Sequence, residues 1–182
     1  MKAVMISIRP EWVHKILSGE KTVEVRKTAP KIETPFKCYI YCTLSGSNEL
    51  FREILNGDVA EWNRGKWSDR KGNVVAEFIC NRVEDFTTNY YTMHRPQTLR
   101  IAREACISLH ELNEYEGNAI CLYGWHISDL KVYDKPKKLS EFKPWHRECF
   151  YSDLGLAIPK CHECHKCKIE RPPQSWCYVE EL

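Results

Sequence analysis

Residues 18–26 read Ser18-Gly19-Glu20-Lys21-Thr22-Val23-Glu24-Val25-Arg26, and the expected elements of the chain can be arranged around them. In the preceding segment, 10–17, apolar side chains recur three and four residues apart, which predicts a short helix with one apolar face. Gly19 is the expected end of that helix, since glycine commonly follows a helix C-terminus. Residues 22–26 then alternate polar and apolar side chains, which is typical of a half-buried strand.

The two faces of this strand differ in chemistry. Val23 and Val25 share one face and are expected in the core. The other face presents a hydroxyl, a carboxylate and a guanidinium, with Lys21 at the turn, and could form the polar floor of a pocket; these residues are Thr22, Glu24 and Arg26. The alternative is an ordinary solvated strand, on which such charge pairs contribute only about a few tenths of a kcal/mol.

Length and composition limit the class of protein. A chain of 182 residues suits one domain with an appendage. The 27 Lys and Arg residues nearly balance the 25 Asp and Glu residues, for a net charge of +2, so any nucleic-acid site must be local. The N-terminus lacks the apolar run of a signal peptide, and nowhere are about 18 apolar residues consecutive. We expect a soluble, cytoplasmic protein.

The remaining elements follow from local patterns. We expect strands at 36–43, 73–83, 119–123 and 125–133, helices at 48–55, 99–105 and 109–116, and loops at 27–35 and 87–91. Ser108 and Glu111 form a capping box for the last helix, which Gly117 ends. Short strands linked by helical excursions, without a βαβ rhythm, predict an α+β fold built on a small β-barrel.

A boundary is expected at Lys135-Pro136-Lys137-Lys138. It divides the chain into a domain at 1–134 and a C-terminal extension at 135–182. The extension is too short to bury a core of its own, so it is expected to pack over the barrel. Within it, the stiff segment 171–179 is expected to return to the barrel and help to wall the pocket.

Three segments together resemble the ASCH family, whose members are small β-barrel domains related to the PUA fold. The first runs from Ile6 to Arg26 and contains Gly19-x-Lys21-x-x-x-x-Arg26; the others are Gly72-Asn73-Val74-Val75-Ala76-Glu77-Phe78 and Trp125-His126-Ile127-Ser128-Asp129-Leu130. The resemblance covers about residues 3–134. It implies a PUA-like β-barrel with flanking short helices, and an association with RNA.

Two functions of different class are open. The first is binding of RNA or a nucleotide, with phosphate contacts and stacking surfaces from Lys21, Arg26, Lys27, Trp62, Arg64, Lys66 and Trp67. Arg70 and Lys71 extend the basic segment that begins at residue 61. Clusters of this kind also occur in solvated loops that bind nothing, and that alternative stays open.

The second function is hydrolysis. Family members that remove the acetyl group of N4-acetylcytidine carry a lysine and a threonine in this turn and strand, and a glutamate from a later helix. The resemblance implies that Lys21 is the base, that Thr22 supplies the hydroxyl because Glu24 stands at the threonine position, and that Glu104 or Glu111 donates the proton. Lys21 and Glu24 acting directly as an acid–base pair, or cleavage of RNA, are further alternatives.

The ten cysteines fall into two groups. In a chain without an export signal they do not predict disulfides, so the scattered Cys38, Cys42, Cys80, Cys106 and Cys121 are expected to act as small apolar residues. A cluster near the C-terminus has the C-x2-C spacing of a structural zinc site, with preferred ligands Cys161, Cys164, Cys167 and Cys177 and with Cys149, His162 and His165 as substitutes. Unmetallated thiols and a redox or iron–sulfur role are the alternatives.

Overall fold

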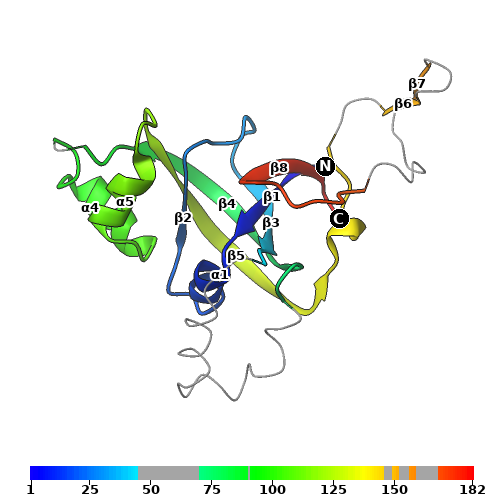
Figure 1. The fold of residues 1–182 in the computed structure, drawn as a ribbon, viewed down its shortest axis with the longest axis horizontal. Coiled ribbons are helices and arrows are strands. Elements are labelled where there is room, and N and C mark those ends of the chain that lie inside the picture. The colour runs from blue at the N-terminus through cyan, green and yellow to red at the C-terminus, as the bar shows by residue number, and fades with distance from the viewer. Residues whose placement is uncertain (45–69, 90, 146–148, 152–155, 159–167) are drawn as a thin grey trace.

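The computed structural model of the protein describes residues 1–44, 70–89, 91–145, 149–151, 156–158 and 168–182. In this part of the chain, six strands form one mixed sheet in the order β2-β5-β4-β3-β1-β8 (Figure 1). The strands are β1 (Lys2–Ile8), β2 (Val23–Arg26), β3 (Phe36–Cys42), β4 (Val74–Phe86), β5 (Leu122–Lys137) and β8 (Trp176–Glu180). β6 (Cys149–Tyr151) and β7 (Leu156–Ile158) form a separate antiparallel pair. The predicted α+β class is confirmed.

Three α-helices lie in the described residues: α1 (Pro10–Leu17), α4 (Pro96–Glu104) and α5 (Leu109–Glu116). A 3-10 turn, η1, spans Leu139–Glu141. α1 ends as predicted, since Gly19 follows it with a φ of +80°. The capping box of α5 is also confirmed, because the Glu111 N–H donates to Ser108 Oγ at 3.2 Å and the Ser108 N–H donates to the Glu111 carboxylate at 2.9 Å. None of these helices is long and apolar enough to cross a membrane.

Some predicted boundaries are wrong. The strands expected at 119–123 and 125–133 are one 16-residue strand, β5, because Gly124 pairs with Val25 on one side and Glu84 on the other instead of ending the ladder. β5 continues to Lys137, four residues beyond the predicted end of the second strand. β4 extends to Phe86, three residues beyond its predicted end. The helix predicted at 48–55 lies outside the described residues.

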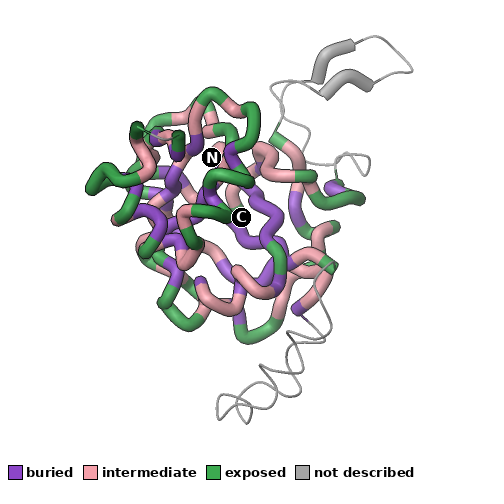
Figure 2. Tube along the Cα trace, turned by 60° about the vertical axis from the view of Figure 1, so that its left-hand side comes forward, coloured by how far each residue is buried: buried purple, intermediate pink, exposed green. Residues whose placement is uncertain are grey.

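Buried side chains form three clusters. Figure 2 colours the buried residues purple along the chain. β1 is buried on both faces: Val4 and Ile6 join a cluster that α1 covers, whereas Ala3 and Met5 join a second cluster on the opposite face. In the first, the Trp125 ring centroid lies 5.9 Å from those of both Phe36 and Trp176. The third cluster packs α4 and α5 against β2 through Val23, Val25, Ile101, Ala102 and Leu112.

The C-terminal segment adds a strand to this sheet. β8 pairs antiparallel with β1, and the Glu181 N–H donates to the Met1 carbonyl at 2.8 Å, so the two ends of the chain lie side by side (Figure 1). The segment expected to return to the barrel therefore reaches β1. The division into a domain and an extension stays a prediction.

The cysteines that the structure describes agree only in part with the packing role. Cys38, Cys42 and Cys80 are buried, whereas Cys106 and Cys121 are partly exposed. Cys161, Cys164 and Cys167 lie outside the described residues, so the zinc site stays a prediction. Among the residues that are described, no group of three or more His, Cys, Asp or Glu side chains could hold a metal ion.

Candidate functional site

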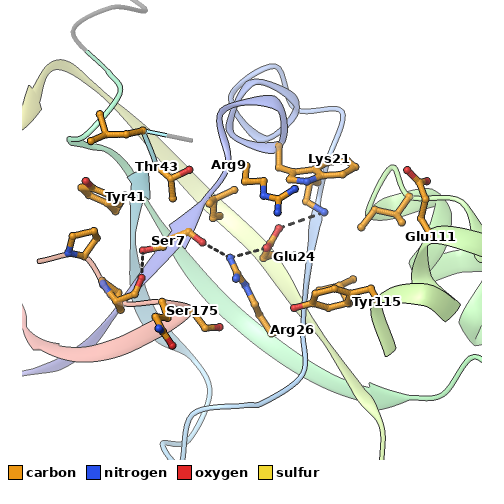
Figure 3. A pocket seen from close by; sticks show the side chains of 18 residues that line it. Ser7, Arg9, Lys21, Glu24, Arg26, Tyr41, Thr43, Glu111, Tyr115 and Ser175 are labelled. Carbon is orange, nitrogen blue, oxygen red and sulfur yellow. Dashed lines mark hydrogen bonds and ion pairs between the residues drawn. The ribbon is translucent and has the colours of Figure 1, made fainter. Parts of the chain in front are cut away.

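A pocket of about 830 Å³ opens between α1, β2, α5 and the segment that leads into β8 (Figure 3). Side chains from separate parts of the chain line it, namely Ser7, Ile8, Arg9, Trp12, Lys21, Glu24, Val25, Arg26, Tyr41, Thr43, Leu44, Ile107, Glu111, Tyr115, Pro172, Pro173, Gln174 and Ser175. The predicted polar face of β2 contributes Glu24 and Arg26, and Lys21 lies at its start. The pocket is thus assembled around the segment that the sequence pattern singled out.

Lys21 is the most deeply buried charged side chain of the pocket, at 2 % exposure. Its Nζ donates to the Ala105 carbonyl at 2.8 Å and lies 3.4 Å from Glu24 Oε2. It also lies 5.2 Å from the centroid of the Trp12 ring, within cation–π range. Burial lowers the pKa of Lys21 because it disfavours the charged form, and this outweighs the opposing effect of Glu24.

Glu24 lies between two cations. One carboxylate oxygen faces Lys21, and the other lies 3.0 Å from Arg26 Nη2, which also donates to the Ser7 carbonyl at 2.6 Å (Figure 3). Glu24 is 6 % exposed, so its orientation is set by these partners rather than by water. Because Ser7 belongs to β1, Arg26 also links the edge strand β2 to a strand on the far side of the sheet.

Aromatic rings supply apolar surface to the same pocket. Trp12 comes from α1, Tyr41 from β3 and Tyr115 from α5. Lys27 Nζ lies 5.1 Å from the centroid of the Tyr115 ring, so this predicted binding residue stands at one aromatic wall. The segment before β8 forms another wall, as expected, and is fixed by Ser7, whose Oγ donates to the Pro173 carbonyl at 2.6 Å.

Glu111 lines the pocket from α5, but its carboxylate is already engaged. Both the hydroxyl and the backbone N–H of Ser108 donate to Glu111, and these hydrogen bonds hold the pKa of Glu111 below its usual range. Glu111 is therefore better suited to accept a hydrogen bond than to donate a proton.

The predicted placement of Thr22 is wrong. Its backbone N–H donates to the Glu104 carbonyl at 2.9 Å, and its carbonyl accepts from the Ile127 N–H at 2.9 Å, just before the first residue of β2. Thr22 and Glu104 line a different hollow of about 440 Å³, together with Asn81, Arg82, His126 and Ile127. The structure thus joins Lys21, Glu24, Arg26 and Glu111 in one pocket and places the other two predicted catalytic residues elsewhere.

Four predicted binding residues are not described by the structure, and several residues that line the pocket were not predicted. Trp62, Arg64, Lys66 and Trp67 lie outside the described residues. Sequence reasoning missed Ser7, Arg9 and Tyr115, and it placed Trp12 only within the apolar face of the helix at 10–17. It expected Gln174 only as part of the wall segment 171–179. No local pattern marks the three missed residues, because they meet only once distant segments pack together.

Comparison with known proteins supports the fold. No protein-family model matches the sequence, and no curated protein does. Among solved structures, the ASCH protein of Zymomonas mobilis matches with a TM-score of 0.59 and 18% identity, over 98% of this chain and 88% of that one. A serine-to-alanine variant of that protein matches with a TM-score of 0.59 and 17% identity, over 98% of this chain and 89% of that one. A tyrosine-to-phenylalanine variant matches with a TM-score of 0.58 and 17% identity, over 100% of this chain and 92% of that one. The chain therefore has the fold of an ASCH-domain protein, as its motifs implied.

Proposed function

We propose that the pocket beside Lys21, Glu24 and Arg26 binds one base of an RNA or of a free nucleotide. The observation that carries this proposal is the nearly buried Glu24 carboxylate, held between two cations in a pocket with aromatic lining. A base needs apolar surface for its ring and fixed polar groups for its edge. The pocket offers both.

The polar groups suit the edge of a base. The Glu24 oxygens accept hydrogen bonds, as an exocyclic amine or a ring N–H requires, and Lys21 and Arg26 donate them, as a carbonyl or a ring nitrogen requires. Their mutual contacts hold these groups in place before a ligand arrives, which lowers the entropy lost on binding.

The rest of the pocket suits the ring, sugar and phosphate. Trp12 and Tyr115 line the cavity, and base–aromatic contact contributes about 1–3 kcal/mol per base. A volume of about 830 Å³ leaves room for more than a base. The exposed Arg9 lines the pocket and would contact a phosphate.

For an RNA ligand, we further propose contacts from Trp62, Arg64, Lys66 and Trp67. This basic, tryptophan-containing segment follows in sequence from Leu44, a residue that lines the pocket. Stacking and phosphate contacts of this kind tolerate many sequences and weaken with salt.

A second candidate function is hydrolysis of a modified nucleoside related to N4-acetylcytidine, or of RNA. One observation favours it: the lowered pKa of Lys21 increases the neutral fraction of an amine that lies 3.4 Å from Glu24. Thr22 lies outside the pocket, however, and Glu111 is a poor proton donor. Binding is therefore the function that the geometry supports best.

The test is to incubate the purified protein with the four nucleoside monophosphates, N4-acetylcytidine and short single-stranded RNAs. Calorimetry would measure binding, and mass spectrometry would detect product. Tyr115→Ala should weaken binding by about 10-fold, because it removes an exposed pocket wall. Tyr91→Ala, at an exposed ring that does not line the pocket, is the matched control.

Each outcome decides between the functions. Absence of binding by the wild type, or equal binding by Tyr115→Ala, would contradict the binding proposal. Deacetylated or cleaved product that disappears in Lys21→Met would establish the hydrolase instead.

A further inference from the structure

The turn that carries Lys21 is held by the C-terminal end of α4. Three consecutive residues of that end contact three consecutive residues of the turn. The Glu104 carbonyl accepts from the Thr22 N–H at 2.9 Å, and the Ala105 carbonyl accepts from Lys21 Nζ at 2.8 Å. The Cys106 thiol lies 3.3 Å from the Glu20 carbonyl.

The Ala105 carbonyl is available because the helix ends there. Ala105 caps α4, and Cys106 follows with a φ of +54°, so the chain turns away. The last carbonyls of a helix lack intrahelical partners and carry its partial negative charge. They are therefore suited to hold an ammonium group, and Lys21 depends on where α4 ends.

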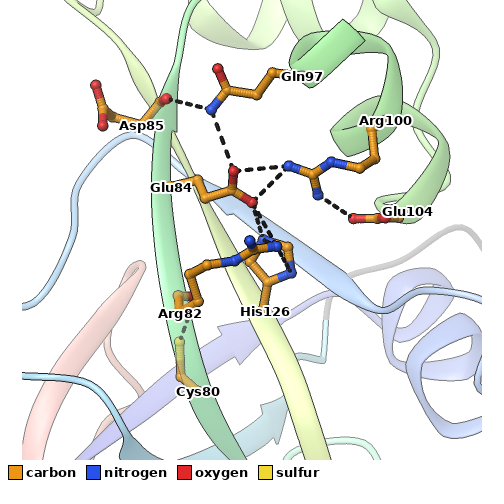
Figure 4. Close-up of polar contacts among 8 residues, drawn as sticks. All are labelled: Cys80, Arg82, Glu84, Asp85, Gln97, Arg100, Glu104 and His126. Atoms are coloured by element: carbon orange, nitrogen blue, oxygen red, sulfur yellow. Dashed lines mark hydrogen bonds and ion pairs between the residues drawn. The ribbon is translucent and has the colours of Figure 1, made fainter.

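Besides the apolar packing of Ile101 and Ala102, a polar contact network joins α4 to the sheet (Figure 4). Arg100, on α4, donates from Nη2 to both Glu84 oxygens at 2.8 Å and from Nη1 to Glu104 at 2.9 Å. Glu84, on β4, is also contacted by Arg82 at 3.1 Å and by His126 at 2.5 Å. Arg100 thus connects the long strands of the sheet to the last turn of the helix.

We propose that Arg100, acting through Glu84 and the carbonyl end of α4, is a positioning residue for Lys21. It does not line the pocket, so its effect on a ligand is transmitted by the Ala105 carbonyl. The expected effect of Arg100 on nucleotide affinity rests on the proposed function of the pocket. The expected effect of Arg100 on the position of Lys21 requires no ligand.

The test compares Arg100→Met with Arg100→Lys and with Arg103→Met, which alters a second arginine of the same helix that is exposed. Reductive methylation followed by mass spectrometry would report the access of reagent to Lys21 Nζ, and calorimetry would report nucleotide affinity. Arg100→Met should increase the rate of Lys21 methylation about fivefold or more and weaken nucleotide binding by a similar factor. Arg100→Lys should restore part of both, and Arg103→Met should change neither.

A merely structural role would lower the melting temperature of Arg100→Met without changing Lys21 methylation, and that result would overturn the proposal. Should Arg100→Met fail to fold, Glu84→Gln provides the same comparison with an isosteric change. If the wild type binds no nucleotide, the proposed function fails, while the methylation rates still decide whether Arg100 positions Lys21.

Discussion

At the scale of residues, the pocket depends on a carboxylate that two cations share. Sequence alternation was sufficient to place Glu24 and Arg26 on one face, because the pairing of β2 with β5 is regular from Val23 to Arg26. It failed for Thr22, which lies just before β2, donates its N–H to the Glu104 carbonyl of α4 and lines a different hollow. The burial of Lys21 was not predictable either, since its partner carbonyl at Ala105 is 84 residues away.

Glu24→Gln should destabilise the protein by about 3 kcal/mol, because Lys21 and Arg26 would remain buried beside a neutral amide. Urea denaturation would measure the change in the free energy of unfolding. Glu33→Gln, at an exposed loop position, should stay within about 0.5 kcal/mol of the wild type. A loss below about 1 kcal/mol at Glu24 would show that the two cations do not depend on the carboxylate.

The lowered pKa of Glu84 predicts how the stability of the folded protein changes with pH. Burial alone raises the pKa of Glu84, but hydrogen bonds from Arg100 and His126 and the charges of Arg100 and Arg82 lower it overall from its ordinary value of 4.5. A carboxyl whose folded pKa is depressed stabilises the folded state above its unfolded pKa, and this contribution is lost as pH falls through the folded value. The stability advantage of wild type over Glu84→Gln should therefore be constant near pH 6–7 and shrink below about pH 4.5.

Thermal denaturation of both proteins between pH 3 and pH 7 would check this expectation. An advantage that grew on acidification would have the wrong sign and would exclude Glu84 as a stabilising anion.

At the scale of elements, the strand and helix types were largely predictable and their ends were not. Gly124 illustrates why: within a strand pattern it suggests a break, whereas in the structure it permits a close approach. A Cβ built there would lie 3.1 Å from Val23 Cγ1 and 3.6 Å from Ile101 Cγ2. The glycine thus lets α4 and β2 pack against a continuous β5, a reason that only the tertiary structure supplies.

Pro136 is a second residue that would suggest the end of a strand. It lies within β5 beyond the stretch that pairs with β2, so its missing N–H is tolerated.

The capping box of α5 has a consequence for the pocket, because this helix carries Tyr115 and Glu111 into it. Ser108→Ala removes the hydroxyl that accepts from the Glu111 N–H, and such changes cost about 0.5–2 kcal/mol. We expect a lower melting temperature and weaker nucleotide binding from fraying of the first turn. Ser140→Ala, at an exposed position in η1, should change neither. A full loss of folding would contradict a local effect.

At the scale of the whole molecule, the sheet and the pocket are completed by residues from the end of the chain. β8 pairs with β1, Trp176 packs on Trp125, and the segment before β8 walls the pocket. The sequence indicated this return through its aromatic and proline content, but not which strand β8 joins. The pairing of β8 with β1 joins residues as distant in sequence as Val4 and Tyr178, which no local pattern encodes.

The same C-terminal region carries the predicted zinc ligands, and we propose one zinc ion per chain. Three cysteines at C-x2-C spacing supply three thiolates, and four ligands complete a structural site. Cys177 is the informative candidate for the fourth, because it lies in β8 opposite Met5 and packs against the second buried cluster. A bond from Cys177 to zinc would anchor the cysteine segment to the sheet, whereas a bond from Cys149, His162 or His165 would not.

Elemental analysis of the purified protein should therefore give about one zinc per chain, and Cys161→Ser and Cys164→Ser should lose most of it. Cys121→Ser, at a partly exposed thiol outside the cluster, should retain the metal. Loss of zinc in Cys177→Ser would identify Cys177, in β8, as the fourth ligand. In that case chelation of the zinc should also lower the melting temperature, because metal binding contributes to folding. Retention of zinc in Cys177→Ser would assign the fourth position to one of the substitutes. A protein that contains no zinc when purified without chelators, with reactive thiols at 161, 164 and 167, would contradict the site.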